Sequence, residues 1–131
     1  MMESDLKFLV VDDVSSMRTL IKSLLRGFGF ANVTSAKSGE EAQKMLDEGD
    51  FEFILADWHM SPGNGLELLN YVRETPRLQK IPFIMVTAEN TKDKILEAIH
   101  FGVDDYIVKP FTTAQLEEKV LQVLVRKDSK S

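Results

Sequence analysis

The stretch Phe8-Leu9-Val10-Val11-Asp12-Asp13 places four apolar residues directly before two carboxylates. A second stretch, Phe53-Ile54-Leu55-Ala56-Asp57, repeats the pattern with one carboxylate. Short runs rich in Val, Ile, Leu and Phe are typical of buried strands, and three carboxylates just beyond two strand ends cannot all be buried unpaired. In an open parallel α/β sheet, ligands bind outside the carboxyl ends of strands where the strand order reverses. If the two strands are neighbours, the acids meet at one mouth, and such close like charges need a cation; carboxylate oxygens suit Mg²⁺.

Apolar runs of strand length alternate with segments of helical period along the chain. Strands are predicted at 6–11, 32–36, 51–56, 82–87 and 105–108. Helices are predicted where apolar residues recur at spacings of three and four. Five strands alternating with five helices require right-handed crossovers and a parallel sheet covered on both faces, so the predicted fold class is an α/β three-layer sandwich. The helical stripes include Met17, Leu20, Ile21, Leu24, Leu25 and Phe28, which end near Gly27 or Gly29, then Ile95, Ala98 and Ile99, and finally Leu116, Val120, Val123 and Leu124.

Length and composition predict one domain, spanning 1–131, with a core at about 6–126 and a polar, frayed tail at 127–131. The absence of cysteine excludes disulfides, thiolate metal sites and a thiol nucleophile. The amino terminus has no basic leader, and no apolar run approaches the ~20 residues of a membrane span, so we expect a cytoplasmic protein with no membrane partner. We also expect a monomer. A formal net charge of −5 without a basic stripe argues against nucleic acid.

Two further predicted strands also end in polar side chains. Thr87 closes the fourth strand, and Lys109 closes the fifth. Each residue alone has an ordinary explanation, because aspartates cap helices, threonine is common in strands and most lysines are solvated. Together, an aspartate nucleophile, a divalent cation, a hydroxyl donor and a lysine are the groups that bind and transfer a phosphoryl group. The sequence therefore predicts a phosphoryl site.

The pairs Asp12-Asp13, Thr87-Ala88 and Lys109-Pro110, together with Asp57, resemble in order and separation the receiver domain of two-component response regulators. The resemblance covers essentially the whole chain and is greatest to single-domain chemotaxis regulators. It implies a flavodoxin-like sheet of order 2-1-3-4-5. It also implies that Asp57 accepts a phosphoryl group from a sensor histidine kinase. Mg²⁺ would bind Asp12, Asp13, Asp57 and the backbone carbonyl of His59, while Lys109, Thr87 and the adjacent Ala88 would contact the phosphoryl group.

The resemblance further implies a switch with no output domain of its own. Thr87 would turn toward the phosphoryl group, and Tyr106 would move into the space that it leaves. The partner surface would lie on the fourth helix, fifth strand and fifth helix, where it suits a short amphipathic acidic peptide; core packing is an equally good explanation for two of its residues, Ile95 and Tyr106. The partner surface comprises Lys92, Ile95, Tyr106 and Lys119.

The implied partners are a CheA-like sensor histidine kinase, a FliM-like flagellar motor switch protein and a phosphatase. The chain would not be an enzyme in the usual sense, although it would assist its own phosphorylation and dephosphorylation. A phosphate sink for another regulator and a regulator of a non-motility pathway stay open as alternatives.

Two other classes of protein fit the sequence less well. A flavin-binding module needs a Ser/Thr/Gly-rich phosphate loop after the first strand, and Asp12-Asp13 repels phosphate unless a metal is present. A Mg²⁺-dependent aspartyl-phosphate phosphatase is expected to carry a second aspartate two residues after the nucleophile, where this chain has His59.

One segment departs from the family pattern. In Trp58-His59-Met60-Ser61-Pro62-Gly63-Asn64-Gly65, the proline lies one position late. Proline fixes its own φ and biases the preceding residue, so we expect a reshaped and less ordered loop and weakened Mg²⁺ binding. His59 is interpreted either as an exposed loop residue or as a contact to the phosphoryl group.

Overall fold

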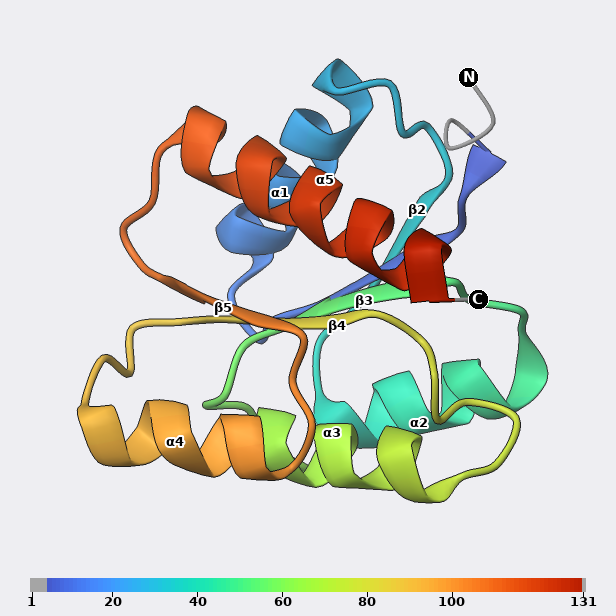
Figure 1. Cartoon of the computed structure of the whole chain (residues 1–131), viewed down its shortest axis with the longest axis vertical. Coiled ribbons are helices and arrows are strands. Elements are labelled where there is room, and N and C mark those ends of the chain that lie inside the picture. The colour runs from blue at the N-terminus through green and yellow to red at the C-terminus, as the bar shows by residue number, and fades with distance from the viewer. Residues whose placement is uncertain (1–4, 131) are drawn as a thin grey trace.

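In the computed structural model, which describes residues 5–130, five strands alternate with five helices (Figure 1). This alternation confirms the predicted α/β class. The first four strands begin one or two residues later than predicted, although Lys7, Asn32 and Pro82, which precede three of them, still accept backbone hydrogen bonds from neighbouring segments. The strands are β1 (Phe8–Val11), β2 (Val33–Ala36), β3 (Phe53–Ala56), β4 (Phe83–Thr87) and β5 (Asp105–Val108); the helices are α1 (Ser15–Gly27), α2 (Gly39–Glu48), α3 (Gly65–Glu74), α4 (Lys92–His100) and α5 (Thr113–Lys130).

The five strands form one parallel sheet in the order β2-β1-β3-β4-β5. Helices α1 and α5 cover one face, and α2, α3 and α4 cover the other (Figure 1). The flavodoxin-like three-layer sandwich is therefore confirmed. The strand order reverses between β1 and β3, which is the crevice where ligands bind in such sheets.

The sheet is buried on both sides. Every residue of β1, β3 and β4 is buried, which explains why these strands read as continuous apolar runs rather than alternating ones. Leu9 and Val11 point into the core beneath α2, α3 and α4, whereas Phe8 and Val10 point into the core beneath α1 and α5. Such packing fixes the strand ends and therefore the positions of the polar residues that follow them.

The prediction that Leu20 and Ile99 belong to the buried stripes of their helices is wrong. Leu20 is 44% exposed and Ile99 is 56% exposed, because the buried stripes of α1 and α4 are narrower than the apolar spacing indicates. Helix α5 extends to Lys130 and so includes most of the segment 127–131; fraying of that segment stays a prediction, and Ser131 lies outside the described residues. Within residues 5–130, no helix combines the length and apolar character that crossing a membrane requires.

Candidate functional site

The sheet register brings the predicted acidic residues together. Val11 of β1 pairs with Ala56 of β3, so the next residue of each strand, Asp12 and Asp57, leaves the sheet at the same edge. One carboxylate oxygen from each of Asp12, Asp13 and Asp57 lies within 4.8 Å of the others. The cluster therefore lies at the carboxyl ends of β1 and β3, where the strand order reverses.

Lys109 lies across two of these acids. Its Nζ donates to Oδ2 of Asp12 at 2.7 Å and to Oδ2 of Asp57 at 2.9 Å. Both acids are almost fully buried, with 1% and 8% of their surfaces exposed, whereas Asp13 is exposed. Burial alone would lower the pKa of Lys109, but the hydrogen bonds and charges of the two carboxylates outweigh it and raise the pKa above its usual value. The lysine is thus a fixed cation at the centre of the cluster.

Backbone amides orient the other carboxylate oxygens. Oδ1 of Asp57 accepts hydrogen bonds from the N–H of Trp58 at 2.6 Å and of His59 at 3.4 Å. Oδ1 of Asp12 accepts from the N–H of Val14 at 2.9 Å, just before α1 begins. Asp12 therefore orients the turn that leads into α1, but it does not cap the helix, whose N-cap is Val14 without a side-chain cap hydrogen bond.

The donor set fits Mg²⁺. Carboxylate oxygens are hard ligands, and one or two of them usually hold this ion together with water. Asp13 gives the cluster an exposed carboxylate beside the two buried ones. The backbone carbonyl of His59 stays a predicted ligand.

Thr87 and Tyr106 meet at a residue that sequence reasoning missed. Thr87 is fully buried, and its Oγ1 accepts from the N–H of Glu89 at 3.3 Å. The Tyr106 hydroxyl donates to the carbonyl of the same Glu89 at 2.8 Å, and its ring packs against the core. Burial first, and then the charges of Glu89 and Asp57, raise the pKa of Tyr106 to about 12. Glu89 therefore links both predicted switch residues, and the inward movement of the ring stays a prediction; Ala88 lies exposed between Thr87 and Glu89.

His59 connects the loop after β3 to the segment after β4. Its side chain is 61% exposed, as expected for a loop histidine, and its Nε2 contacts Oε2 of Glu89. A contact with a phosphoryl group is not tested by this arrangement. A second link joins the same two segments, because Nζ of Lys94 in α4 lies 5.0 Å from the centre of the Trp58 ring. The sequence could have indicated Glu89 as a site residue only through its position, two residues beyond the end of the fourth strand.

The loop with the late proline is attached to the start of α2. The carbonyls of Pro62 and Gly63 accept hydrogen bonds from the N–H groups of Glu40 at 3.1 Å and Gly39 at 2.9 Å. At the other end, Asn64 caps α3 in a reciprocal capping box with Glu67. These contacts are more extensive than the sequence led us to expect, while the predicted weakening of Mg²⁺ binding stays a prediction.

The four residues of the predicted partner surface lie on α4, β5 and α5, as expected. Lys92 is exposed and Ile95 is half-buried. Lys119 is paired with Asp105, whose Oδ1 lies 3.2 Å from its Nζ. The side of α4 that carries Lys92 and Ile95 also carries the exposed Leu96, which sequence reasoning did not place on this surface.

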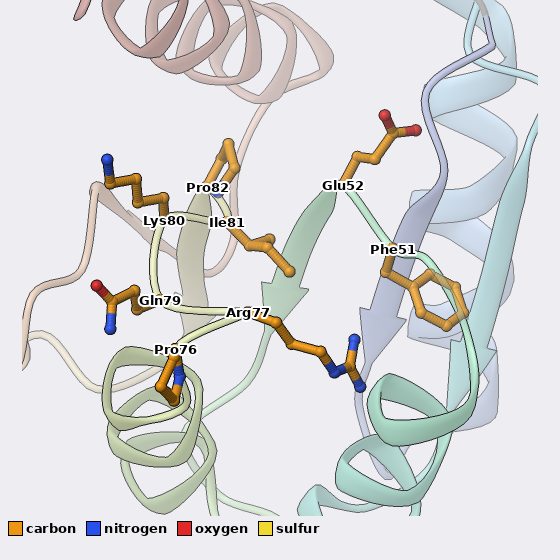
Figure 2. A pocket seen from close by; sticks show the side chains of 8 residues that line it. All are labelled: Phe51, Glu52, Pro76, Arg77, Gln79, Lys80, Ile81 and Pro82. Atoms are coloured by element: carbon orange, nitrogen blue, oxygen red, sulfur yellow. The ribbon is translucent and has the colours of Figure 1, made fainter. Parts of the chain in front are cut away.

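A separate groove lies at the opposite, amino-terminal edge of the sheet. Figure 2 shows the Arg77 side chain crossing this groove toward Phe51. Arg77 also donates a hydrogen bond to the carbonyl of Leu46. The groove has a volume of about 380 Å³ and contains no predicted site residue; it is lined by Phe51, Glu52, Pro76, Arg77, Gln79, Lys80, Ile81 and Pro82.

A doubly wound sheet with three acids, a buried threonine and a bridging lysine at its switch point defines a flavodoxin-like protein with an aspartate-centred ionic site. The family model of the response regulator receiver domain matches residues 8–121, so the chain belongs to the response regulator receiver family. The predicted family is thereby confirmed.

Relatives support the same membership. The chain is 46% identical over 121 residues to the chemotaxis protein CheY of Pseudomonas aeruginosa, covering 92% of this chain and 98% of that one. It is 43% identical over 125 residues to chemotaxis protein CheY-3 of Vibrio cholerae, covering 95% and 96%. The solved structure of the chemotaxis response regulator CheY4 of Vibrio cholerae superposes with a TM-score of 0.84 at 29% identity, covering 91% and 98%.

Proposed function

We propose that the chain is a phosphorylation-activated switch whose phosphoryl acceptor is Asp57 and whose donor is the phosphohistidine of a CheA-like sensor kinase. The observation that carries this proposal is the pair of hydrogen bonds from Lys109 to Asp12 and Asp57. A half-buried lysine across two buried carboxylates leaves both oriented and partly neutralised at the mouth of the sheet. The match to the receiver family supports the same conclusion.

The transfer needs a nucleophile and a fixed cation. A carboxylate oxygen of Asp57 attacks phosphorus, the bond from phosphorus to the donor imidazole breaks, and the imidazole keeps the electron pair and takes up a proton. The amides of Trp58 and His59 orient the carboxylate through Oδ1. Lys109 can pair with the added oxygens. Mg²⁺, held by Asp12, Asp13 and Asp57 with the predicted His59 carbonyl, would offset the charge that develops during transfer.

The product changes the charge beside Thr87. A phosphoryl group adds roughly 1.5 to 2 negative charges and three acceptor oxygens. The Thr87 hydroxyl can donate to one of them while its oxygen bonds the Glu89 amide, and Tyr106 reads the same segment through the Glu89 carbonyl. We infer that this route biases α4, β5 and α5 toward partner binding.

The partner in this proposal is a short acidic amphipathic segment, such as that of a FliM-like motor switch protein. Similarity to two chemotaxis proteins, CheY and CheY-3, supports a role in chemotaxis. A phosphatase would reset the switch, and receiver proteins are generally not classed as enzymes. His59 in place of a second aspartate disfavours the aspartyl-phosphate phosphatase alternative.

The test is phosphorylation with a small phosphodonor and Mg²⁺, followed by mass spectrometric mapping of the acyl phosphate. Asp57→Asn should abolish the modification, whereas the exposed control Asp50→Asn should leave it unchanged. Full modification of Asp57→Asn would refute the assignment. Pull-downs with a motor switch peptide and a kinase regulator-binding domain, with and without beryllofluoride as a phosphoryl mimic, then identify the partner.

A further inference from the structure

Cationic side chains of α5 face two acids at the amino end of β5. Nζ of Lys119 lies 3.2 Å from Oδ1 of Asp105, and a guanidinium nitrogen of Arg126 lies 3.4 Å from Oδ2 of the same residue. Nζ of Lys127 lies 3.1 Å from Oδ1 of Asp104. Two consecutive acids of the chain therefore already occupy the cations along one side of α5.

The two acids differ in what else they hold. Asp104 accepts from Arg73 and from the N–H of Phe83, both at 2.8 Å, so it ties the end of α3 to the start of β4 and β5. Asp105 also accepts a hydrogen bond from the N–H of Tyr106 at 2.8 Å. Its main partner, Lys119, keeps 37% of its side chain exposed. The pair of Asp105 and Lys119 can therefore separate without opening the core.

The surroundings suit a partner that also carries carboxylates. Strand β5 is one of the two edge strands, with α4 on one face of the sheet and α5 on the other (Figure 1). On α4, exposed Leu96 and Ile99 share a side with Lys92, while Lys94 on the other side lies over Trp58. An amphipathic segment could place apolar residues on α4 and an acid on Lys119, which already binds a carboxylate of its own chain.

We propose that Asp105 is an intramolecular competitor that occupies Lys119 until an acidic partner segment displaces it. This inference rests on the proposed function, because it concerns the same partner surface. Tyr106 directly follows Asp105, so displacement of the acid acts on the residue that the proposed switch moves. Asp105 thereby lowers the affinity for acidic partners and restricts binding to segments whose apolar contacts compensate.

The size of the effect follows from the partial exposure of the pair, since 37% of the Lys119 side chain and 19% of the Asp105 side chain are exposed. Exposed ion pairs shift an equilibrium by up to roughly fivefold and weaken in salt. Replacing Asp105 by Asn keeps a side-chain oxygen for the Tyr106 amide while removing the charge. We expect Asp105→Asn to tighten binding of an acidic peptide by roughly two- to fivefold at low salt, with a smaller gain at high salt.

The probe is a fluorescein-labelled synthetic amphipathic helix with glutamates on its polar face, compared with a glutamine version of the same peptide. Anisotropy titrations use the full chain, with and without beryllofluoride. The matched control is Glu118→Gln, which makes the same charge change at an exposed position of α5. Lys119→Ala alone and combined with Asp105→Asn completes a double-mutant cycle. In the Lys119→Ala background, Asp105→Asn should no longer tighten binding of the acidic peptide.

A second measurement reads the pair without any partner. Limited acetylation followed by mass spectrometry should modify Lys119 at least about twice as fast in Asp105→Asn as in the parent chain, with Lys92 as the internal reference. Urea denaturation verifies that each variant is folded.

The outcomes separate this inference from the proposed function. Tighter peptide binding by Asp105→Asn that disappears in the Lys119→Ala background supports the inference. This holds even if beryllofluoride has no effect on binding, a result that would count against the proposed switch. Any of three results would overturn the inference: an equal increase in peptide affinity in Asp105→Asn and Glu118→Gln, an unchanged rate of Lys119 acetylation, or no binding of the acidic peptide to any variant. If beryllofluoride changed the affinity for the acidic peptide but Asp105→Asn did not, the proposed switch would be supported and the role of Asp105 as a competitor would be refuted.

Discussion

Gly65 offers the sharpest test of how the fold positions the nucleophile. This residue opens α3 and donates its N–H to the carbonyl of Trp58 at 2.8 Å. A Cβ at this position would lie 2.1 Å from the carbonyl oxygen of Asp57 and 2.9 Å from both the carbonyl carbon of Asp57 and Cα of Trp58. All three are backbone atoms, so no side-chain rotation relieves the clash. Gly65→Ala must therefore move the start of α3 or the backbone of Asp57.

The cost can be estimated from two opposing effects. Alanine favours a helix over glycine by about 0.5–1 kcal/mol. Overpacking typically costs about 1–3 kcal/mol, and a contact more than 1 Å inside the ordinary limit belongs at the upper end. We expect a net loss of about 2 kcal/mol, equivalent to a Tm lower by about 6–10 °C for a chain of this size. A shift of the nucleophile by about 1 Å would slow phosphorylation on the order of a hundredfold.

Urea denaturation followed by Trp58 fluorescence measures the stability, and a small phosphodonor with Mg²⁺ measures the rate. The matched control is Gly27→Ala in α1, where nothing lies within 4 Å of the added Cβ. That variant should be unchanged or more stable by up to about 1 kcal/mol. If Gly65→Ala matched it in both stability and phosphorylation rate, the close approach of α3 to Asp57 would not be what fixes the nucleophile.

Three further predictions concern charge. Without Mg²⁺, Asp13→Asn should raise the free energy of unfolding by up to about 1 kcal/mol, because it relieves repulsion in the acidic cluster. MgCl₂ should no longer raise the Tm of this variant, and an unchanged response to MgCl₂ argues against Asp13 as a ligand. Ultraviolet titration, assigned with Tyr106→Phe, should place the pKa of Tyr106 at about 12. The raised pKa contributes fully to stability below pH 10.0, and this contribution is lost as pH rises through about 12. Ionisation of Tyr106 near pH 10.0 would contradict the burial of its hydroxyl. Arg73→Met should cost about 1–3 kcal/mol, because it removes hydrogen bonds to Asp104 and to the carbonyls of Gly102 and Ile81 while Lys127 stays paired with Asp104. Arg73→Lys should recover part of this loss, and equal stability of the Met variant would contradict the prediction.

The acidic site could be predicted because local patterns determine it. The strands before Asp12 and Asp57 are buried at every position, so their apolar runs mark both the strand and the residue at which it ends. Once the strands pair in parallel, the residues after them must share an edge. The same reasoning placed Thr87 and Lys109, since each closes a recognisable strand.

Contacts between distant polar residues could not be predicted in this way. Glu89 joins Thr87, Tyr106 and His59, yet in the sequence it is one charged residue in a polar segment. The apolar spacing of α4 likewise assigned Ile99 to the core, although the side of a helix that packs depends on its tilt against the sheet. Spacing gives the period of a helix, whereas its neighbours decide how wide the buried stripe is.

The loop with the late proline shows how tertiary context can replace local order. The sequence predicts a reshaped and less ordered loop, because the proline lies one position late. In the fold, Gly63 has a φ of +84°, and a Cβ there would lie 2.8 Å from the N–H nitrogen of Glu40. The glycine is what allows the loop carbonyls to reach the first N–H groups of α2, which have no acceptor within their own helix. Helix α2 therefore holds the loop at positions 62 and 63, and Glu89 holds it at the side chain of His59, so both ends of the segment that carries the predicted carbonyl ligand are tied to neighbouring elements.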